Sequence, residues 1–142
     1  MKLLISGLGG SLFPYLHNSL STEFEIHYID ADQQLKYLYP DLNFHLCPMV
    51  SDDNYWIVIR KLIDQFGIDF YIPLIDEEIV IAKRNVEGFS AVKVISPTAD
   101  FSELCLNKFE LMQYLKKENI SDVISYTGDN YHSELGFPIF IK

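Results

Sequence analysis

The sequence has few of the residues that build disulfide frameworks and metal centres. Its 142 residues include only two cysteines, Cys47 and Cys105, which lie far apart in the chain. Two such residues provide neither a disulfide framework nor the ligand spacing of a zinc site, so we expect both to be reduced, mostly buried thiols in a cytoplasmic protein. No apolar run approaches the roughly 18–20 residues that cross a bilayer, which predicts no membrane-spanning segment.

Basic residues are also scarce, because 11 lysines and arginines stand against 20 acidic residues and give a net charge of −9. An acidic chain repels phosphate backbones, so we expect no nucleic-acid partner. The four histidines (His17, His27, His45 and His132) are scattered without ligand spacing. We expect each to be a surface or half-buried residue and not a metal ligand. Apolar residues are plentiful at 49%, enough for one compact domain or one domain with the start of another.

A glycine cluster separates a predicted strand from a predicted helix near the start of the chain. The strand covers 2–6, the cluster is Gly7-Leu8-Gly9-Gly10, and apolar residues at helical spacing follow at Leu12, Phe13, Leu16 and Leu20. Such glycines allow a tight turn and let backbone amides approach an anion, which makes Gly9 and Gly10 candidate substrate contacts. A full dinucleotide fingerprint would need glycine at position 12, so a tight turn without a ligand stays an equal interpretation.

Strand-like and helix-like segments then alternate as far as Pro97. Strands are predicted at 25–30, 69–75 and 91–95, and helices at 55–66 and 76–86, with a polar crossover at 32–43 that has no strong period. Ser51, Asp52 and Asp53 are candidate N-caps, and Gly67 stands where a helix ends. The alternation predicts an α/β fold with a doubly wound, Rossmann-like parallel sheet over residues 1–97, and a second domain beginning at residue 98.

Acidic residues occur where predicted strands end. Asp30 closes the second strand at the position where NAD-binding folds place the acid that holds ribose, and Asp76-Glu77-Glu78 follows the next apolar strand. The three consecutive acids suit the positive end of a helix dipole, but they also lie at the edge where parallel sheets bind ligands. Asp76 and Glu77 are therefore candidate contacts to a substrate ammonium group. No catalytic triad is visible, and we expect no catalytic residue in this chain.

The character of the sequence changes after Pro97. Two helices are predicted at 101–106 and 108–117, the second with Phe109, Met112 and Leu115 facing inward, followed by short strands at 122–126 and 137–142. The sequence stops inside the last apolar strand without a cap or a polar tail, which favours a fragment of a longer protein.

Six stretches together resemble the front end of ATP-grasp enzymes, especially the branch similar to the large subunit of carbamoyl-phosphate synthase. In chain order they are KLLISGLGG, YIDAD, IDFYIPLIDEEIVIAK, VISP, LNKFELMQYLKK and GFPIFIK, and they span the whole chain. The resemblance implies a Rossmann-like pre-ATP-grasp domain at 1–97 and the start of an ATP-grasp domain at 98–142.

By the same resemblance, Lys108 and Lys142 correspond to the two basic residues that contact ATP in this family. Asn107 departs from the pattern, since an acid commonly precedes the first lysine. The family's magnesium ligands follow the second lysine, so the expected cofactors are ATP and magnesium, with the metal ligands outside this chain and the fragment alone inactive. The implied reaction activates a carboxylate or bicarbonate as an acyl phosphate for attack by an amine or another nucleophile. The expected partners are small carboxylate and amine substrates, and a homodimer is left open.

Two other interpretations stay open at this point. One is an NAD(P)-binding Rossmann protein, which Asp30 favours and Leu12 disfavours. The other is a binding or oligomerisation module without enzymatic activity.

Overall fold

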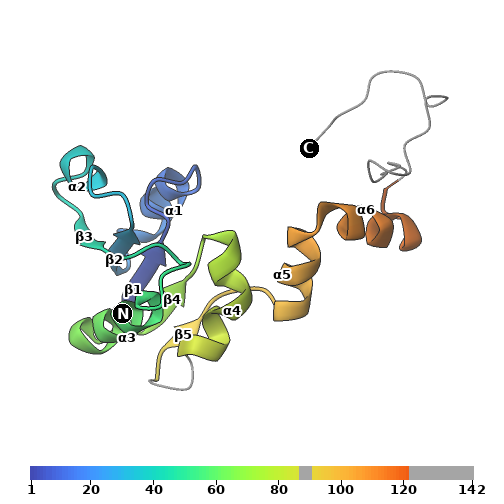
Figure 1. Cartoon of the computed structure of the whole chain (residues 1–142). Helices are drawn as coiled ribbons and strands as arrows, with labels where there is room; N and C mark the ends of the chain where they lie inside the picture. Colours follow the sequence, from blue (N-terminus) through green and yellow to red (C-terminus); the bar gives the residue numbers. More distant parts are fainter. Residues whose placement is uncertain (87–90, 122–142) are drawn as a thin grey trace. The chain divides into compact units, whose positions relative to one another are not determined.

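The computed structural model describes residues 1–86 and 91–121 (Figure 1). The chain divides into two compact units, Met1–Ser102 and Glu103–Lys142. Each unit is described by itself below. In the part of the chain that the structure describes, no helix combines the length and apolar character needed to cross a membrane.

The first unit is built on a five-stranded, all-parallel sheet. Its strands are β1 (Lys2–Ser6), β2 (Glu25–Asp30), β3 (Asn43–Leu46), β4 (Phe70–Ile72) and β5 (Lys93–Val94), in the order β3-β2-β1-β4-β5. This order is that of the first five strands of a Rossmann sheet. The predicted α/β class and the parallel, Rossmann-like sheet are therefore confirmed. The winding direction reverses between β1 and β4, at the centre of the sheet.

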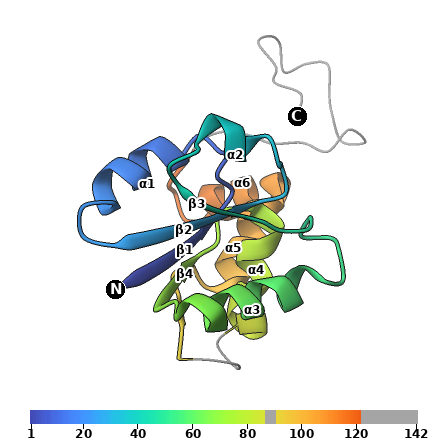
Figure 2. The ribbon, with the colours of Figure 1, turned by 90° about the vertical axis from the view of Figure 1, so that its left-hand side faces the viewer.

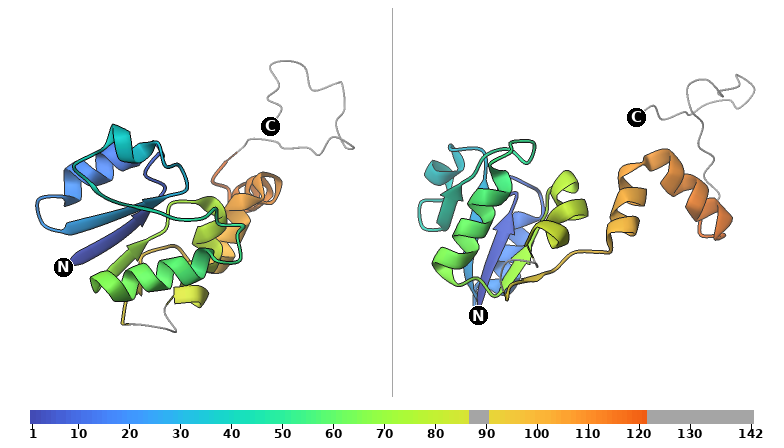
Figure 3. Two further views of the ribbon diagram at one scale, coloured as in Figure 1. Left: turned by 60° about the vertical axis from the view of Figure 1, so that its left-hand side comes forward. Right: turned by 60° about the horizontal axis from the view of Figure 1, so that its bottom comes forward.

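Helices cover both faces of this sheet (Figures 2 and 3). On one face Leu3 and Ile5 pack with helices α1 (Phe13–Leu20) and α2 (Leu35–Leu38). On the other face Leu4 packs with helices α3 (Tyr55–Phe66) and α4 (Asp76–Val86). Successive β1 side chains point to opposite faces, so a continuous apolar strand fills both cores.

The long helices lie where the apolar spacing placed them. Both α3 and α4 have the predicted bounds, and Gly67 ends α3 in a left-handed conformation with φ of 62°. The expected capping by the acids before α3 is wrong, because the N-cap is Asn54 and its side chain makes no capping hydrogen bond. Asp52 instead accepts from the backbone N–H of Asn54 at 2.8 Å, which closes a turn before the helix.

One strand was missing from the sequence prediction, and two are shorter than predicted. β5 covers only Lys93–Val94 of the predicted 91–95. β3 is a four-residue edge strand, NFHL, which follows the crossover without an apolar alternation to mark it. β4 ends at Ile72 because Pro73 has no N–H to continue the ladder. Tyr71 is fully buried, whereas Phe70 and Ile72 on the opposite face are only half-buried. β4 is thus fully covered on one face only.

The second unit is described only as far as Ser121. Helix α5 (Ala99–Leu106) leads into helix α6 (Lys108–Lys117), whose N-cap Asn107 accepts from the N–H of Glu110 at 3.2 Å. The predicted inward face of α6 is wrong, because none of its residues is buried and the described part of this unit offers only the end of α5 for packing. The strands predicted at 122–126 and 137–142 lie outside the described residues.

Candidate functional site

A cleft of about 740 Å³ lies at the carboxyl ends of β1, β2, β3 and β4. This is the edge at which parallel sheets bind ligands, next to the point where the strand order reverses. Its walls come from four segments that follow these strands and from one turn of α4. The lining residues are Gly7, Gly10, Ser11, Leu12, Asp30, Ala31, Cys47, Pro48, Met49, Val50, Ser51, Leu74, Ile75, Glu77 and Ile81.

The glycine turn after β1 is closed by its own hydrogen bonds. Gly7 has φ of 70°, a left-handed conformation that explains the glycine at this position. The N–H of Gly10 donates to the carbonyl of Gly7 at 2.9 Å, and the N–H of Gly9 donates to Oδ2 of Asp30 at 3.0 Å. Both amides that a phosphate would need from these two glycines therefore already have acceptors within the protein.

Asp30 organises the turn from the end of β2. Its Oδ2 accepts from Gly9, and its Oδ1 accepts from the N–H of Asp32 at 3.0 Å. Each carboxylate oxygen therefore has one backbone donor and keeps capacity to accept a further hydrogen bond. Asp30 is first of all the residue that holds the glycine turn in place.

The ionisable groups at the cleft surface are acidic, and its walls are apolar. Asp30 and Glu77 contribute the carboxylates, and none of the described residues that line the cleft is basic. Leu12 and Met49 stay 56% and 66% exposed although they line it, so apolar surface is available to a ligand. The cleft therefore suits a ligand with a cationic or hydrogen-bond-donating group and an apolar part, and it repels phosphate groups.

A buried carboxylate lies next to the cleft. Glu78 is fully buried and accepts hydrogen bonds from the hydroxyl of Ser6 at the end of β1 and from the hydroxyl of Tyr55 at the start of α3. The Ser6 hydroxyl in turn accepts from the N–H of Leu74 at 2.8 Å. Glu78 thereby ties α4 to the end of β1 and to the start of α3.

Burial shapes the chemistry of this network. It raises the pKa of Glu78 to about 7, although the hydrogen bonds from Ser6 and Tyr55 favour the charged form. Burial, with the nearby carboxylates of Asp30 and Glu78, also raises the pKa of the Cys47 thiol to about 12. A thiol in this state is a poor nucleophile at neutral pH, so Cys47 serves as a packing residue in the cleft wall.

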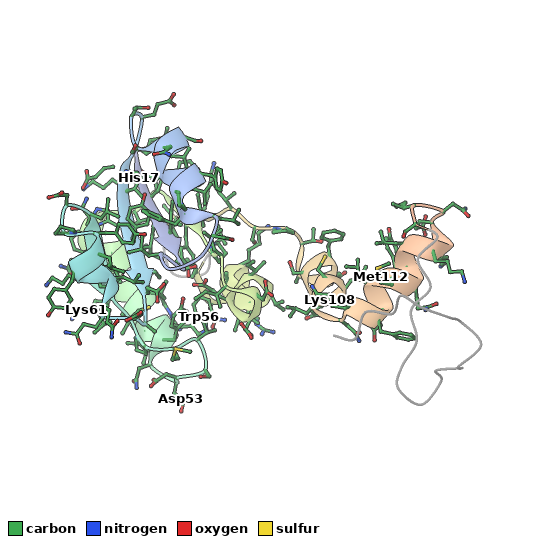
Figure 4. The ribbon with its side chains drawn as sticks, turned by 90° about the horizontal axis from the view of Figure 1, so that it is seen from above. His17, Asp53, Trp56, Lys61, Lys108 and Met112 are labelled. Carbon is green, nitrogen blue, oxygen red and sulfur yellow. The ribbon has the colours of Figure 1, made fainter. Side chains whose placement is uncertain are left out.

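Of the residues predicted to contact substrate, Gly10 and Glu77 line the cleft. Gly9 is not among the lining residues, but its N–H donates to Asp30, which is. Asp76 is exposed at the start of α4 and is not among the lining residues either. The two predicted ATP contacts belong to the second unit of the chain. Lys142 lies outside the described residues, and Lys108 lies on α6 with Met112 (Figure 4). The Lys108 ammonium is exposed and donates to the carbonyl of Cys105 at 2.6 Å.

Two features of the site were not predicted from the sequence, the cleft wall after β3 and the buried position of Glu78. The segment 47–51 lines the cleft because β3 ends there, and β3 itself had no sequence signal. The sequence places Glu78 with Asp76 and Glu77 as three consecutive acids at the start of a helix, and their residue type does not by itself separate it from them. The spacing could have identified it, since Glu78 is one turn before Ala82 and two turns before Val86 on the buried face of α4.

Two of the histidines, His27 and His45, lie next to each other although they are 18 residues apart in the sequence. His27 is 4% exposed and forms hydrogen bonds with His45 and Glu25, so the expectation of a surface or half-buried residue is wrong for His27. His17 forms a hydrogen bond with Tyr28 on the face covered by α1, opposite to the layer that carries Trp56 and Lys61 (Figure 4). Within the described ranges no group of three or more histidine, cysteine, aspartate or glutamate residues could hold a metal ion.

Comparison of the sequence with models of known protein families gives no match, and comparison with curated proteins gives none either. The function proposed below therefore depends on the residues of the cleft and of α6.

Proposed function

We propose that this chain is the N-terminal part of an ATP-grasp ligase, in which the cleft binds the amine-bearing substrate and ATP binds elsewhere. The observation that carries the proposal is the chemistry of the cleft. Its glycine amides are engaged within the protein, its ionisable surface residues are Asp30 and Glu77, and none of its described lining residues is basic. Such a site attracts an ammonium group and disfavours the phosphates of a nucleotide.

In this proposal the exposed carboxylate of Glu77 accepts a hydrogen bond from the substrate ammonium group. Asp30 adds a second negative charge to the cleft lining and holds the glycine turn. Leu12 and Met49 cover the apolar part of the substrate and exclude water from the amine. Together these residues would hold the amine in one orientation for attack on an activated carboxylate.

The ATP site would include Lys108, and Lys142 as the second basic residue. The Lys108 ammonium donates one hydrogen bond, to the carbonyl of Cys105. Because an ammonium group has three N–H donors, Lys108 can also donate to a phosphate. The described residues do not fit a magnesium ion, because they contain no group of three suitable ligands. The proposal therefore assigns magnesium to ligands outside the described residues and routes no step through it.

The experiment is a titration of the isotope-labelled chain followed by the NMR signals of its backbone amides. The probes are the standard amino acids as amines, NAD⁺, and ATP with magnesium. We expect amine-bearing probes to shift the signals of 7–12 and 47–51. Glu77→Gln should weaken this binding about tenfold, the effect of one charge-assisted hydrogen bond of about 1.5 kcal/mol. Asp76→Asn, a neighbouring exposed acid that does not line the cleft, is the matched control.

The alternatives are outcomes of the same titration. Binding of NAD⁺ at the cleft, with no response to amines, would replace the proposal by an NAD(P)-binding protein. No response of the cleft to any of the three probe classes would favour a module without enzymatic activity.

A further inference from the structure

Two histidines face each other between the edge strand β3 and its neighbour β2. Nδ1 of His27 lies 2.9 Å from Nε2 of His45. The ring planes differ by 14° and their centroids are 5.2 Å apart, so the hydrogen bond runs almost within a common plane. The ring of Phe66, near the end of α3, covers both imidazoles with centroid distances of 4.5 and 4.6 Å.

The partners of His27 limit how many protons the pair can hold. Nε2 of His27 lies 3.1 Å from Oε1 of Glu25, and because a carboxylate only accepts, this nitrogen carries a hydrogen. A single hydrogen then lies between His27 and His45, donated by one ring and accepted by the other. If both rings were protonated, two N–H groups would face each other across 2.9 Å and the hydrogen bond would be lost.

Two charged side chains lie beside the pair. Glu25 on β2 faces His27, and Lys2 on β1 lies 3.4 Å from the same carboxylate. From α3 the pair is covered by the uncharged ring of Phe66. Burial, followed by the neighbouring His27, lowers the pKa of His45. The second proton is therefore taken up more readily when the pair has opened.

The strand that carries His45 leads directly into the cleft. β3 ends at Leu46, and the next five residues, 47–51, form the cleft wall. Among the described strands, the edge strand β3 pairs with β2 alone. Loss of a contact that holds β3 against β2 would therefore also release the cleft wall formed by 47–51.

We propose that His27 and His45 form an acid-sensitive latch that holds β3, and the cleft wall after it, against β2 and α3. The latch is independent of the ligand that the cleft binds. The stability that it contributes is fully present above the unfolded pKa of histidine, about 6.5, and is lost as the pH falls through the lower value of the folded state.

The test compares the 142-residue chain with three variants by urea unfolding and amide hydrogen exchange from about pH 8 to about pH 5. His45→Gln keeps an N–H donor for His27 but cannot be protonated, so its loss of stability on acidification should be smaller than that of the parent. Glu25→Gln removes the charge that offsets protonated His27, so its loss should be larger. His17→Gln, a histidine on the opposite face, is the matched control. In the parent, the protection factors of the amides at 43–51 should fall on acidification before those of the rest of the sheet.

The proposal is overturned if the parent and His45→Gln lose stability in parallel, or if Glu25→Gln reduces the acid sensitivity. It is also overturned if residues 43–51 exchange only through global unfolding at every pH. The opposite-sign variants keep the test decisive should one of them fold poorly.

Discussion

Replacing Glu78 by glutamine should make the protein more stable relative to the parent as the pH rises, because a buried carboxylate loses stability when it ionises. Burial raises the pKa of Glu78 from 4.5 to about 7, so the native protein retains a proton that the unfolded chain releases. The ionised group therefore destabilises the native state, with an effect that is absent below about pH 4.5 and complete above about pH 7. At about 1.4 kcal/mol for each pH unit, this shift corresponds to about 3 kcal/mol.

Glutamine resembles the neutral form of Glu78 in size and hydrogen bonding. We therefore expect the free energy of unfolding of Glu78→Gln, relative to the parent, to rise by about 3 kcal/mol between about pH 4.5 and about pH 8. The assay is urea unfolding at a series of pH values, with equal slopes as the check on two-state behaviour. Glu77→Gln removes the adjacent exposed carboxylate and should show no comparable rise. If the free energies of unfolding of Glu78→Gln and the parent change in parallel with pH, burial does not raise the pKa of Glu78.

Further predictions concern the glycine turn and the two lysines. Gly7→Ala should cost about 1–2 kcal/mol of stability because φ is 70°, whereas Gly9→Ala, whose added Cβ would meet its nearest atom at 3.5 Å, should change unfolding by less than about 0.5 kcal/mol. Gly10→Val should destabilise by about 1–3 kcal/mol in thermal unfolding, since its Cβ would lie 3.1 Å from the rigid carbonyl oxygen of Gly7, and an unchanged midpoint would contradict this. In the proposed ligase, Lys108→Met and Lys142→Met should each weaken ATP binding about 10- to 150-fold, as measured by ATP titration. Lys108→Met should change stability by less than about 0.5 kcal/mol, and ATP dependence within twofold of the parent for both variants would remove the main chemical support for an ATP-grasp ligase.

Apolar periodicity and glycine placement predicted most of the first unit from the sequence. α3 shows how this works, because five apolar residues at helical spacing and Gly67 define its face and its end. The five are Tyr55, Ile59, Leu62, Ile63 and Phe66. β3 could not be found in this way. NFHL is a half-buried edge segment whose two polar side chains, Asn43 and His45, are satisfied by neighbours on β2, and such tertiary contacts leave no local pattern.

The candidate site was predicted at the level of the sheet edge more reliably than at the level of residues. Glu77 and Gly10 followed from their places after strands, because parallel strands bring their carboxyl ends together. The difference between Glu77 and Glu78 could not be read from two identical letters. It depends on which face of α4 packs against Tyr55, and so on the position of a helix that begins more than twenty residues earlier.

The central position of β1 has a consequence for how the chain acquires its structure during synthesis. β1 leaves the ribosome before the other strands of the sheet, and β2 completes one of its edges soon afterwards. Its other edge must wait for β4, which pairs Leu3 with Phe70 and Ile5 with Ile72. At about 5–20 residues per second, this leaves an apolar strand with one open edge for several seconds. The nascent chain is therefore most exposed to aggregation before residue 72 emerges, and slowing translation of the α3 region should lower the yield of folded protein.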